Sequence, residues 1–178
     1  MYLFKDGGGR DVGMRYDLSV PTARVLAQYP SLPKPFKRYQ IQPAWRAEKP
    51  QRGRYREFLQ CDIDTFCSDS YLADAEIISC TLDALKAIGF KKPQMWINDR
   101  TIFDTLGLTK KEVIIIDKLD KIGKEAVINE LENAGRKEAQ ALFNSIESSI
   151  KTERLKDIFQ FLEQSGYTEG EDYLFVPF

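Results

Sequence analysis

Arginines, carboxylates and an aromatic ring gather in the stretch from Ala44 to Gln60, which reads AWRAEKPQRGRYREFLQ. An arginine guanidinium is a planar fork that binds phosphate oxygens through two parallel hydrogen bonds. The ring of Phe58 could stack on a nucleobase, a contact worth about 1–3 kcal/mol in nucleic-acid sites. Carboxylates nearby can bind a metal ion or an amine. Together these side chains indicate a site for a nucleotide and an amine-bearing substrate.

Two strands on either side of a loop would position these side chains. Side chains alternate between the two faces of a strand, so residues two apart share a face. We call one face of this predicted hairpin the polar face. It carries Gln40, Gln42, Ala44, Arg46, Glu48, Arg56, Phe58, Gln60, Asp62 and Asp64. Lys49–Gly53 lies between the strands and contains proline, glycine and charge, as loops do.

The opposite face of the hairpin is mostly apolar, and we expect it to pack against a helix. It carries Tyr39, Ile41, Trp45 and Leu59, and also Cys61. We therefore expect Cys61 and Cys67 to be small core residues. The arrangement predicted is an antiparallel strand–loop–strand, with Arg52, Arg54 and Arg56 above its polar face.

Composition limits what the chain can do. The formal net charge is −1, so only a local cluster can attract an anion. The chain has no histidine, which excludes histidine bases, Ser-His-Asp triads and histidine-ligated metals. An odd count of 3 cysteines favours neither a disulfide framework nor a zinc site. No apolar run approaches the roughly 18 residues that span a bilayer. A solvated hairpin with a charged tip and a nucleic-acid-binding module remain alternatives.

Three further elements are predicted before residue 100. Leu18 to Pro30 reads as a short helix that Ser19 can cap. Ser68 to Gly89 is an amphipathic helix, with Ser70 as a candidate cap and the glycine as its stop. Gln94 to Asn98 reads as a short strand.

Residues 101 to 178 differ in composition from the residues before them, because they are rich in lysine and glutamate and their apolar residues recur with a helical period. Four helical segments are predicted: 110–122, 124–135, 136–149 and 151–166. The chain then ends on YLFVPF, an apolar strand-like run, which suggests that it was cut from a longer one.

Several stretches resemble one known family. FKRYQIQPAWRAEKPQRGRYREFLQCDIDTF (36–66) resembles the second signature motif of class II aminoacyl-tRNA synthetases, in the form found in histidyl-tRNA synthetases. GMRYDLSVPTARVLA (13–27) resembles the segment before that motif, and ADAEIISCTLDALKAIG (73–89) the helix after it. DKLDKIGKEAV (117–127) looks like the eukaryotic-type insertion region.

The resemblance implies a fold and a division of the chain. The fold class is α+β, with part of the antiparallel sheet of the class II catalytic core, flanking helices and a mostly helical insertion. Residues 1–104 would belong to the catalytic core, and residues 105–178 to the insertion and a returning C-terminal strand.

The resemblance also implies roles for eight residues. Arg46 would bind the ATP α-phosphate and act in catalysis, while Glu48 and Arg54 would contact ATP and Phe58 would stack on adenine. The residues implied for histidine are Asp17, Ser19, Gln60 and Asp64. No resident metal is implied; Mg²⁺ would accompany ATP. For Asp17 the alternative is a favourable charge at the start of a helix, and for Phe58 it is plain packing.

The implied activity is that of a histidine–tRNA ligase, which activates histidine to histidyl-adenylate and transfers it to tRNA(His). The full-length enzyme would be a cytoplasmic homodimer without a membrane association, with a mitochondrial form as the alternative. The family's first and third motifs, its histidine-specific segment and its anticodon-binding domain are not found in the 178 residues. We therefore expect this chain alone to be inactive. The alternative function is a non-catalytic, synthetase-like regulatory subunit of ATP phosphoribosyltransferase.

Overall fold

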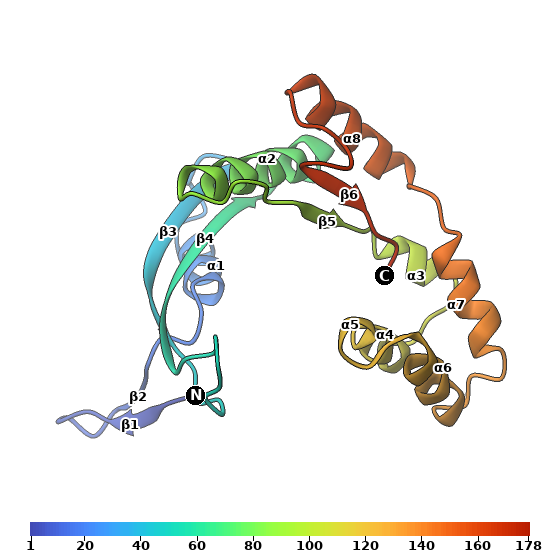
Figure 1. Cartoon of the computed structure of the whole chain (residues 1–178). Helices are drawn as coiled ribbons and strands as arrows, with labels where there is room; N and C mark the ends of the chain where they lie inside the picture. The colour runs from blue at the N-terminus through green and yellow to red at the C-terminus, as the bar shows by residue number, and fades with distance from the viewer. The chain divides into compact units, whose positions relative to one another are not determined.

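A computed structural model describes residues 1–178, which divide into two compact units, Met1–Ala73 and Asp74–Phe178 (Figure 1). Helices and antiparallel strands occur together, so the predicted α+β class is confirmed. The expected boundary near residue 104 separates a catalytic core from an insertion, and that functional division stays a prediction. None of the helices is long and apolar enough to cross a membrane.

The first unit contains two antiparallel strand pairs and one complete helix. Its elements are β1 (Leu3–Lys5), β2 (Asp11–Gly13), α1 (Ser19–Gln28), β3 (Phe36–Trp45) and β4 (Glu57–Phe66). The pair β3–β4 is the predicted strand–loop–strand, with a register that runs from Phe36 opposite Phe66 to Trp45 opposite Glu57. Strand alternation therefore placed the polar face correctly.

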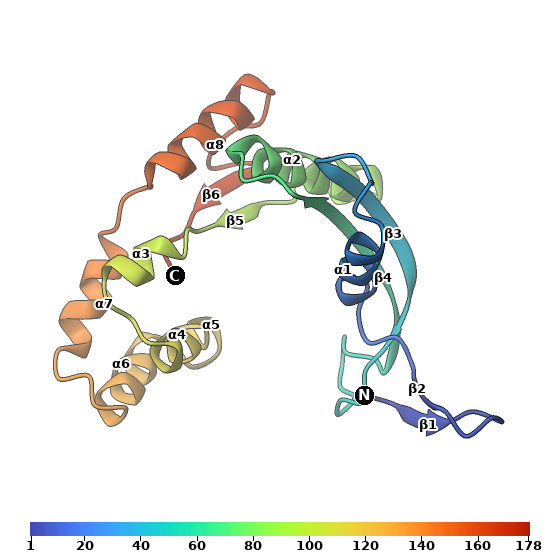
Figure 2. The same ribbon diagram turned by 180° about the vertical axis from the view of Figure 1, so that it is seen from behind.

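The predicted packing of the hairpin was wrong in one respect, because its apolar face is exposed. Tyr39, Ile41 and Leu59 are 77%, 58% and 73% exposed, and all three cysteines are exposed as well. Helix α1 lies beside the hairpin in both views (Figures 1 and 2). The start of α1 is bonded to Arg38, which lies opposite Asp64 in the register and so belongs to the polar face as well. Ala44 on this face is small and fully buried.

The predicted cap of α1 was also wrong. Ser19 is the first helical residue, and the backbone N–H of Val20 instead bonds to the carboxylate of Asp17 at 2.9 Å. A carboxylate two residues before the helix can reach an unpaired N–H of the first turn and also favours the positive end of the helix dipole. Asp17 thus has a structural role at this end of α1.

The second unit is mostly helical. Its elements are α2 (Tyr71–Ala87), whose first turn contains the boundary between the units, β5 (Met95–Ile97), α3 (Thr101–Thr105), α4 (Lys110–Ile116), α5 (Leu119–Ile122), α6 (Lys124–Asn133), α7 (Ala139–Glu147), α8 (Glu153–Gln164) and β6 (Tyr173–Phe175). The predicted cap Ser70 accepts a hydrogen bond from the N–H of Leu72 at 3.2 Å. The predicted helical segments are confirmed, although the first of them is divided into α4 and α5.

The apolar C-terminal run forms a strand, as predicted, and it has a partner. Strand β6 lies parallel to β5, with Met95 opposite Tyr173 and Ile97 opposite Phe175 (Figures 1 and 2). Tyr173 is 1% exposed, and its ring forms a T-shaped pair with that of Phe159 in α8, with ring centres 4.8 Å apart. A core of residues from α3, α4, α6 and α7 stabilises the rest of this unit.

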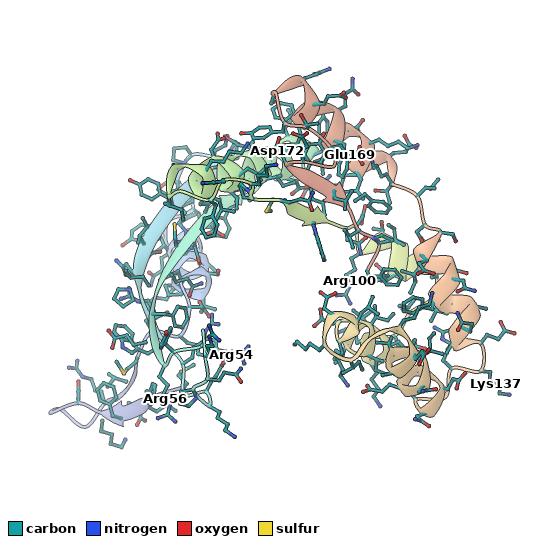
Figure 3. The ribbon with its side chains drawn as sticks, viewed as in Figure 1. Arg54, Arg56, Arg100, Lys137, Glu169 and Asp172 are labelled. Carbon is teal, nitrogen blue, oxygen red and sulfur yellow. The ribbon has the colours of Figure 1, made fainter.

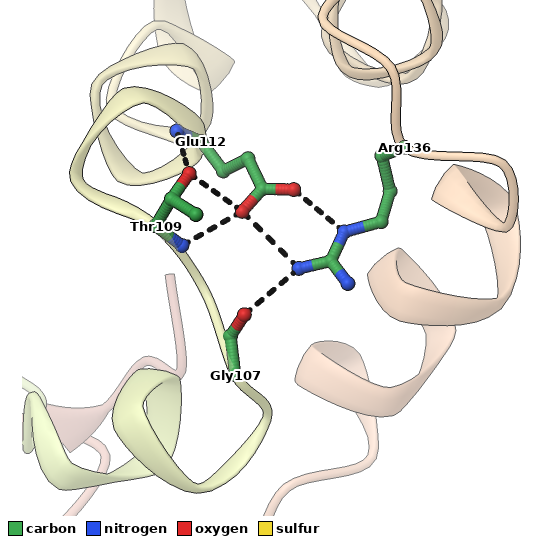
Figure 4. Close-up of polar contacts among 4 residues, drawn as sticks. All are labelled: Gly107, Thr109, Glu112 and Arg136. Carbon is green, nitrogen blue, oxygen red and sulfur yellow. Dashed lines mark hydrogen bonds and ion pairs between the residues drawn. The ribbon is translucent and has the colours of Figure 1, made fainter.

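One nearly buried ion pair joins α4 to the turn that follows α6 (Figure 4). Arg136 donates from Nε to one carboxylate oxygen of Glu112 at 2.6 Å and from Nη2 to the other at 3.1 Å. The same Nη2 donates to the carbonyl oxygen of Gly107 at 3.1 Å. Glu112 also forms a capping box with Thr109 at the start of α4. One carboxylate thus holds a helix end and a distant loop together.

Candidate functional site

An open pocket of about 710 Å³ lies at the loop end of the β3–β4 hairpin. Its lining includes all four residues implied for ATP, namely Arg46, Glu48, Arg54 and Phe58, and also Lys49, Gln51, Gly53 and Tyr55. Three of these eight residues are cationic and one is acidic, so the pocket has an excess of positive charge. Figure 3 shows Arg54 and Arg56 at this end of the hairpin. A pocket with this lining favours an anionic ligand.

The loop that holds Arg54 is closed by its own backbone. Gln51 and Arg54 exchange two backbone hydrogen bonds, with N···O distances of 3.2 and 2.9 Å. Gly53 has φ +76°, a left-handed conformation that glycine adopts without a steric penalty. At the base of the loop, the N–H of Arg46 donates to the carbonyl of Arg56 at 2.9 Å. Local turn chemistry therefore positions Arg54 over the pocket.

Arg46 lies between two aromatic rings. Its guanidinium carbon is 4.9 Å from the ring centre of Tyr16 and 5.2 Å from that of Phe58. Its Nε also donates to the carbonyl oxygen of Tyr16 at 3.3 Å. These contacts fix the plane of the guanidinium while its remaining N–H groups stay available. Tyr16 was not identified from the sequence, because only the fold brings it to the hairpin.

Glu48 and Arg54 form the one ion pair inside the pocket. Their closest atoms are 3.5 Å apart, and the two side chains are 38% and 61% exposed. An ion pair this long and this exposed contributes little to stability. Both side chains can therefore turn toward a ligand at small cost.

The residues implied for histidine occupy the next part of the same face. Gln60 and Asp64 follow Phe58 on the polar face of β4, while Asp17 and Ser19 lie at the start of α1. Arg38 of β3 links these two groups, because its Nη2 lies 2.6 Å from Oδ2 of Asp64 and donates to the carbonyl of Leu18 at 3.1 Å. Helix α1 and strand β4 thus meet at one arginine.

The polar face also carries all of the buried side-chain polar atoms that lack a hydrogen-bond partner. They are Nε of Arg38, Oε1 of Gln42, Oε1 of Gln60 and Oδ2 of Asp64. Arg38 lies opposite Asp64 in the strand register and Gln42 lies opposite Gln60, with the Gln40–Asp62 pair between these two pairs. The contact of Arg38 with Asp64 Oδ2 is an ion pair without hydrogen-bond geometry. An unsatisfied buried polar atom costs about 1–3 kcal/mol, and such groups gather where a ligand can satisfy them.

Asp62, for which no role was predicted, contacts one of these residues. Its Oδ1 accepts a hydrogen bond from Nε2 of Gln60 at 2.9 Å. This bond fixes the orientation of the Gln60 amide and leaves its carbonyl oxygen without a partner. The parity of the strand predicts that Asp62 and Gln60 share a face, and that is the signal by which this contact could have been found.

The comparisons with known proteins agree with this geometry. The sequence model of the family described as histidyl-tRNA synthetase matches residues 1–169. The histidine–tRNA ligase of Rhodopirellula baltica is 51% identical over 151 residues, which are 79% of this chain and 34% of that protein. The histidine–tRNA ligase of Helicobacter hepaticus is 42% identical over 92% of this chain and 40% of its own length.

Solved structures give the same result for the fold. A crystal structure of histidyl-tRNA synthetase from Nostoc sp. superposes with a TM-score of 0.69 and 26% identity, and the match covers 92% of this chain and 39% of that one. The apo S. aureus histidyl-tRNA synthetase matches with a TM-score of 0.58 over 99% of this chain; at 18% identity it supports the fold alone.

This chain spans less than half of the relatives named here, with shares of 34–40% for the two ligases and 39–44% for the two solved structures. Both ligases are bacterial, and the expected eukaryotic type of the insertion stays a prediction. The family match over residues 1–169, the identity of 42–51% and the superposed fold lead to one conclusion: the chain belongs to the histidyl-tRNA synthetase family.

Proposed function

We propose that this chain supplies the ATP- and histidine-binding part of a histidine–tRNA ligase. The observation that carries the proposal is the polar face of the β3–β4 hairpin. It joins a cationic pocket with an aromatic ring at one end to a cluster of unsatisfied polar atoms at the other. A nucleotide suits the first end and an amino acid the second, so the two substrates would meet on one strand.

The proposed chemistry requires two substrates to be held in line. The carboxylate of histidine attacks the α-phosphorus of ATP, a P–O bond forms to the amino acid, and the bond to the leaving pyrophosphate breaks. Negative charge develops on the phosphate oxygens, and the guanidinium of Arg46 would stabilise it. Arg54 would contact the outer phosphates, and Phe58 would stack on adenine. The step needs no proton transfer from a histidine of the enzyme, which agrees with the absence of that residue.

Asp17, Ser19, Gln60 and Asp64 would hold the amino acid. The side-chain carbonyl oxygen of Gln60, which has no partner, would accept a hydrogen bond from the ammonium group of the bound histidine. The carboxylate of Asp64 would bind the imidazole of that histidine. Asp17 contributes its second oxygen, since the first accepts from Val20. Ser19 supplies a hydroxyl next to it.

Mg²⁺ would enter with ATP. The chain has no cluster of three metal-ligating side chains. Magnesium often binds through substrate phosphates and only one or two carboxylates, and Glu48 is the single carboxylate that lines the pocket. The residues present therefore fit a metal that the nucleotide brings, and Mg²⁺ would neutralise phosphate charge there.

The remaining assignments extend the same proposal. tRNA(His) would accept the histidyl group, the full-length enzyme would be a homodimer, and it would act in the cytoplasm. The residues 1–104 would belong to its catalytic core and the residues 105–178 to its insertion.

Titration calorimetry tests the binding proposal directly. We expect the purified 178-residue chain to bind ATP–Mg²⁺ and, separately, histidine, because each ligand meets its own end of the polar face. A chain that binds histidine but not ATP would contradict the proposal and favour the regulatory subunit of ATP phosphoribosyltransferase. That alternative has no need of a pocket lined by Arg46, Arg54 and Phe58.

Catalysis by the chain alone is a separate question. We expect the 178 residues to show no histidine-dependent exchange of pyrophosphate into ATP, because the chain spans only 34–40% of the two ligases. The measurement follows labelled pyrophosphate with and without histidine. Exchange above the histidine-free background would overturn this expectation and leave the binding proposal intact.

A further inference from the structure

We propose that Arg38 is a positioning residue for the histidine site, which sets the orientation of Asp64 and the place of the α1 start. The inference rests on the proposed function.

Arg38 contacts three elements of the first unit with one guanidinium. Nη2 reaches Oδ2 of Asp64 in β4 at 2.6 Å and donates to the carbonyl of Leu18, next to α1, at 3.1 Å. Nη1 donates to Oε1 of Gln40 on its own strand. The side chain of Arg38 is only 10% exposed, and that of Asp64 is 26% exposed. A contact with Asp64 at this depth is screened less by solvent than a surface ion pair.

The position of Leu18 makes this contact relevant to the ligand. Leu18 lies between Asp17 and Ser19, and it is fully buried. A hydrogen bond to its carbonyl therefore fixes the backbone from which both of those side chains project. Arg38 thus connects the two sides of the proposed amino-acid pocket, one on α1 and one on β4.

Only an arginine can make this set of contacts. Its planar fork offers separate N–H groups at fixed angles, whereas lysine has one ammonium group on a flexible stem. Arg38 would hold one oxygen of Asp64, so that the other can face the imidazole. Its Nε has no partner in the chain, which gives the ligand or a bridging water one more donor.

The test is histidine and ATP–Mg²⁺ titration of the 178-residue chain with Arg38→Gln, Arg38→Lys and Asp64→Asn. Loss of hydrogen bonds that involve a charged group costs roughly 10- to 100-fold in an equilibrium constant, so we expect Arg38→Gln to weaken histidine binding by about that much. We expect ATP–Mg²⁺ binding to stay within about two-fold, because no Arg38 contact reaches the loop pocket. Arg38→Lys should recover part of the loss. Arg24→Gln, an exposed change on α1, is the matched control.

A double-variant cycle separates positioning from general structure. If Arg38 acts through Asp64, Arg38→Gln should weaken histidine binding much less in the Asp64→Asn background than in the wild type. Additive losses, or equal losses for histidine and ATP, would show a purely structural role and overturn the inference.

The outcomes also separate this inference from the proposed function. A wild-type chain that binds no histidine contradicts both. A wild-type chain that binds histidine, with an Arg38→Gln variant that binds it equally well, overturns the role of Arg38 alone.

Discussion

Glutamine in place of Glu112 is expected to lower the free energy of unfolding of the Asp74–Phe178 unit by about 2–4 kcal/mol. The Glu112 side chain is 10% exposed and that of Arg136 is 28% exposed. Removing one member of a buried pair leaves the other charge uncompensated, which costs about 3–5 kcal/mol, and the partial exposure of Arg136 reduces that cost. Glutamine can also accept from the N-cap N–H in a capping box, so the expected loss comes from the ion pair and not from the cap of α4.

Urea unfolding, followed by circular dichroism, measures this change. Glu132→Gln is the matched control, because Glu132 lies on α6, is exposed and forms none of the contacts in Figure 4. We expect it to change the free energy of unfolding by less than about 0.5 kcal/mol. A Glu112→Gln variant as stable as the control would show that the ion pair contributes nothing net.

The same carboxylate makes the unit sensitive to acid. Burial acts to raise the pKa of Glu112, but hydrogen bonds from Thr109 and Arg136 and the charge of Arg136 outweigh it and lower the pKa below its ordinary value of 4.5. A lowered pKa in the folded state contributes stability above the unfolded pKa, and that stability is lost as pH falls through the folded value. The difference in stability between wild type and Glu112→Gln should therefore shrink below about pH 4.

The sequence predicted those parts of the fold that depend on neighbours along the chain. Strand alternation predicted the β3–β4 hairpin, and helical periodicity predicted the segments between residues 110 and 166. These predictions succeed because side-chain direction repeats every two residues in a strand and every 3.6 in a helix. The short helix α3 was missed, since its five residues are too few to show a period.

Contacts between distant segments could not be predicted in the same way. Alternation shows that the two faces of a hairpin differ, but not which of them a helix covers, so Tyr39 and Leu59 were expected to be buried and are exposed. Arg38 and Tyr16 reach the site only through the fold, 26 and 30 residues from their partners Asp64 and Arg46. At the start of α1, two capping residues were available, and only the backbone geometry selects Asp17 over Ser19.

Alanine in place of Arg46 is expected to weaken ATP–Mg²⁺ binding by about 10- to 150-fold. Hydrogen bonds to a charged group contribute about 1.5–3 kcal/mol, and the fork of Arg46 would offer two of them to the α-phosphate. Histidine binding should change little, because the Arg46 side chain contacts Tyr16 and Phe58 and none of the residues around Asp64. Arg46→Lys keeps the charge and loses the fork, so it should give an intermediate affinity.

Arg52→Ala is the matched control for Arg46→Ala, since it removes the same charge from the same loop. Arg52 is exposed and does not line the pocket. A general attraction between the loop and a polyanion would make the two variants equally weak, and both losses would fade as salt is added. A specific phosphate contact would instead give a large loss for Arg46 alone that persists at moderate salt. Equal losses of ATP affinity in the two variants would therefore show that the loop is only a charged hairpin tip, and would remove the main support for an ATP site.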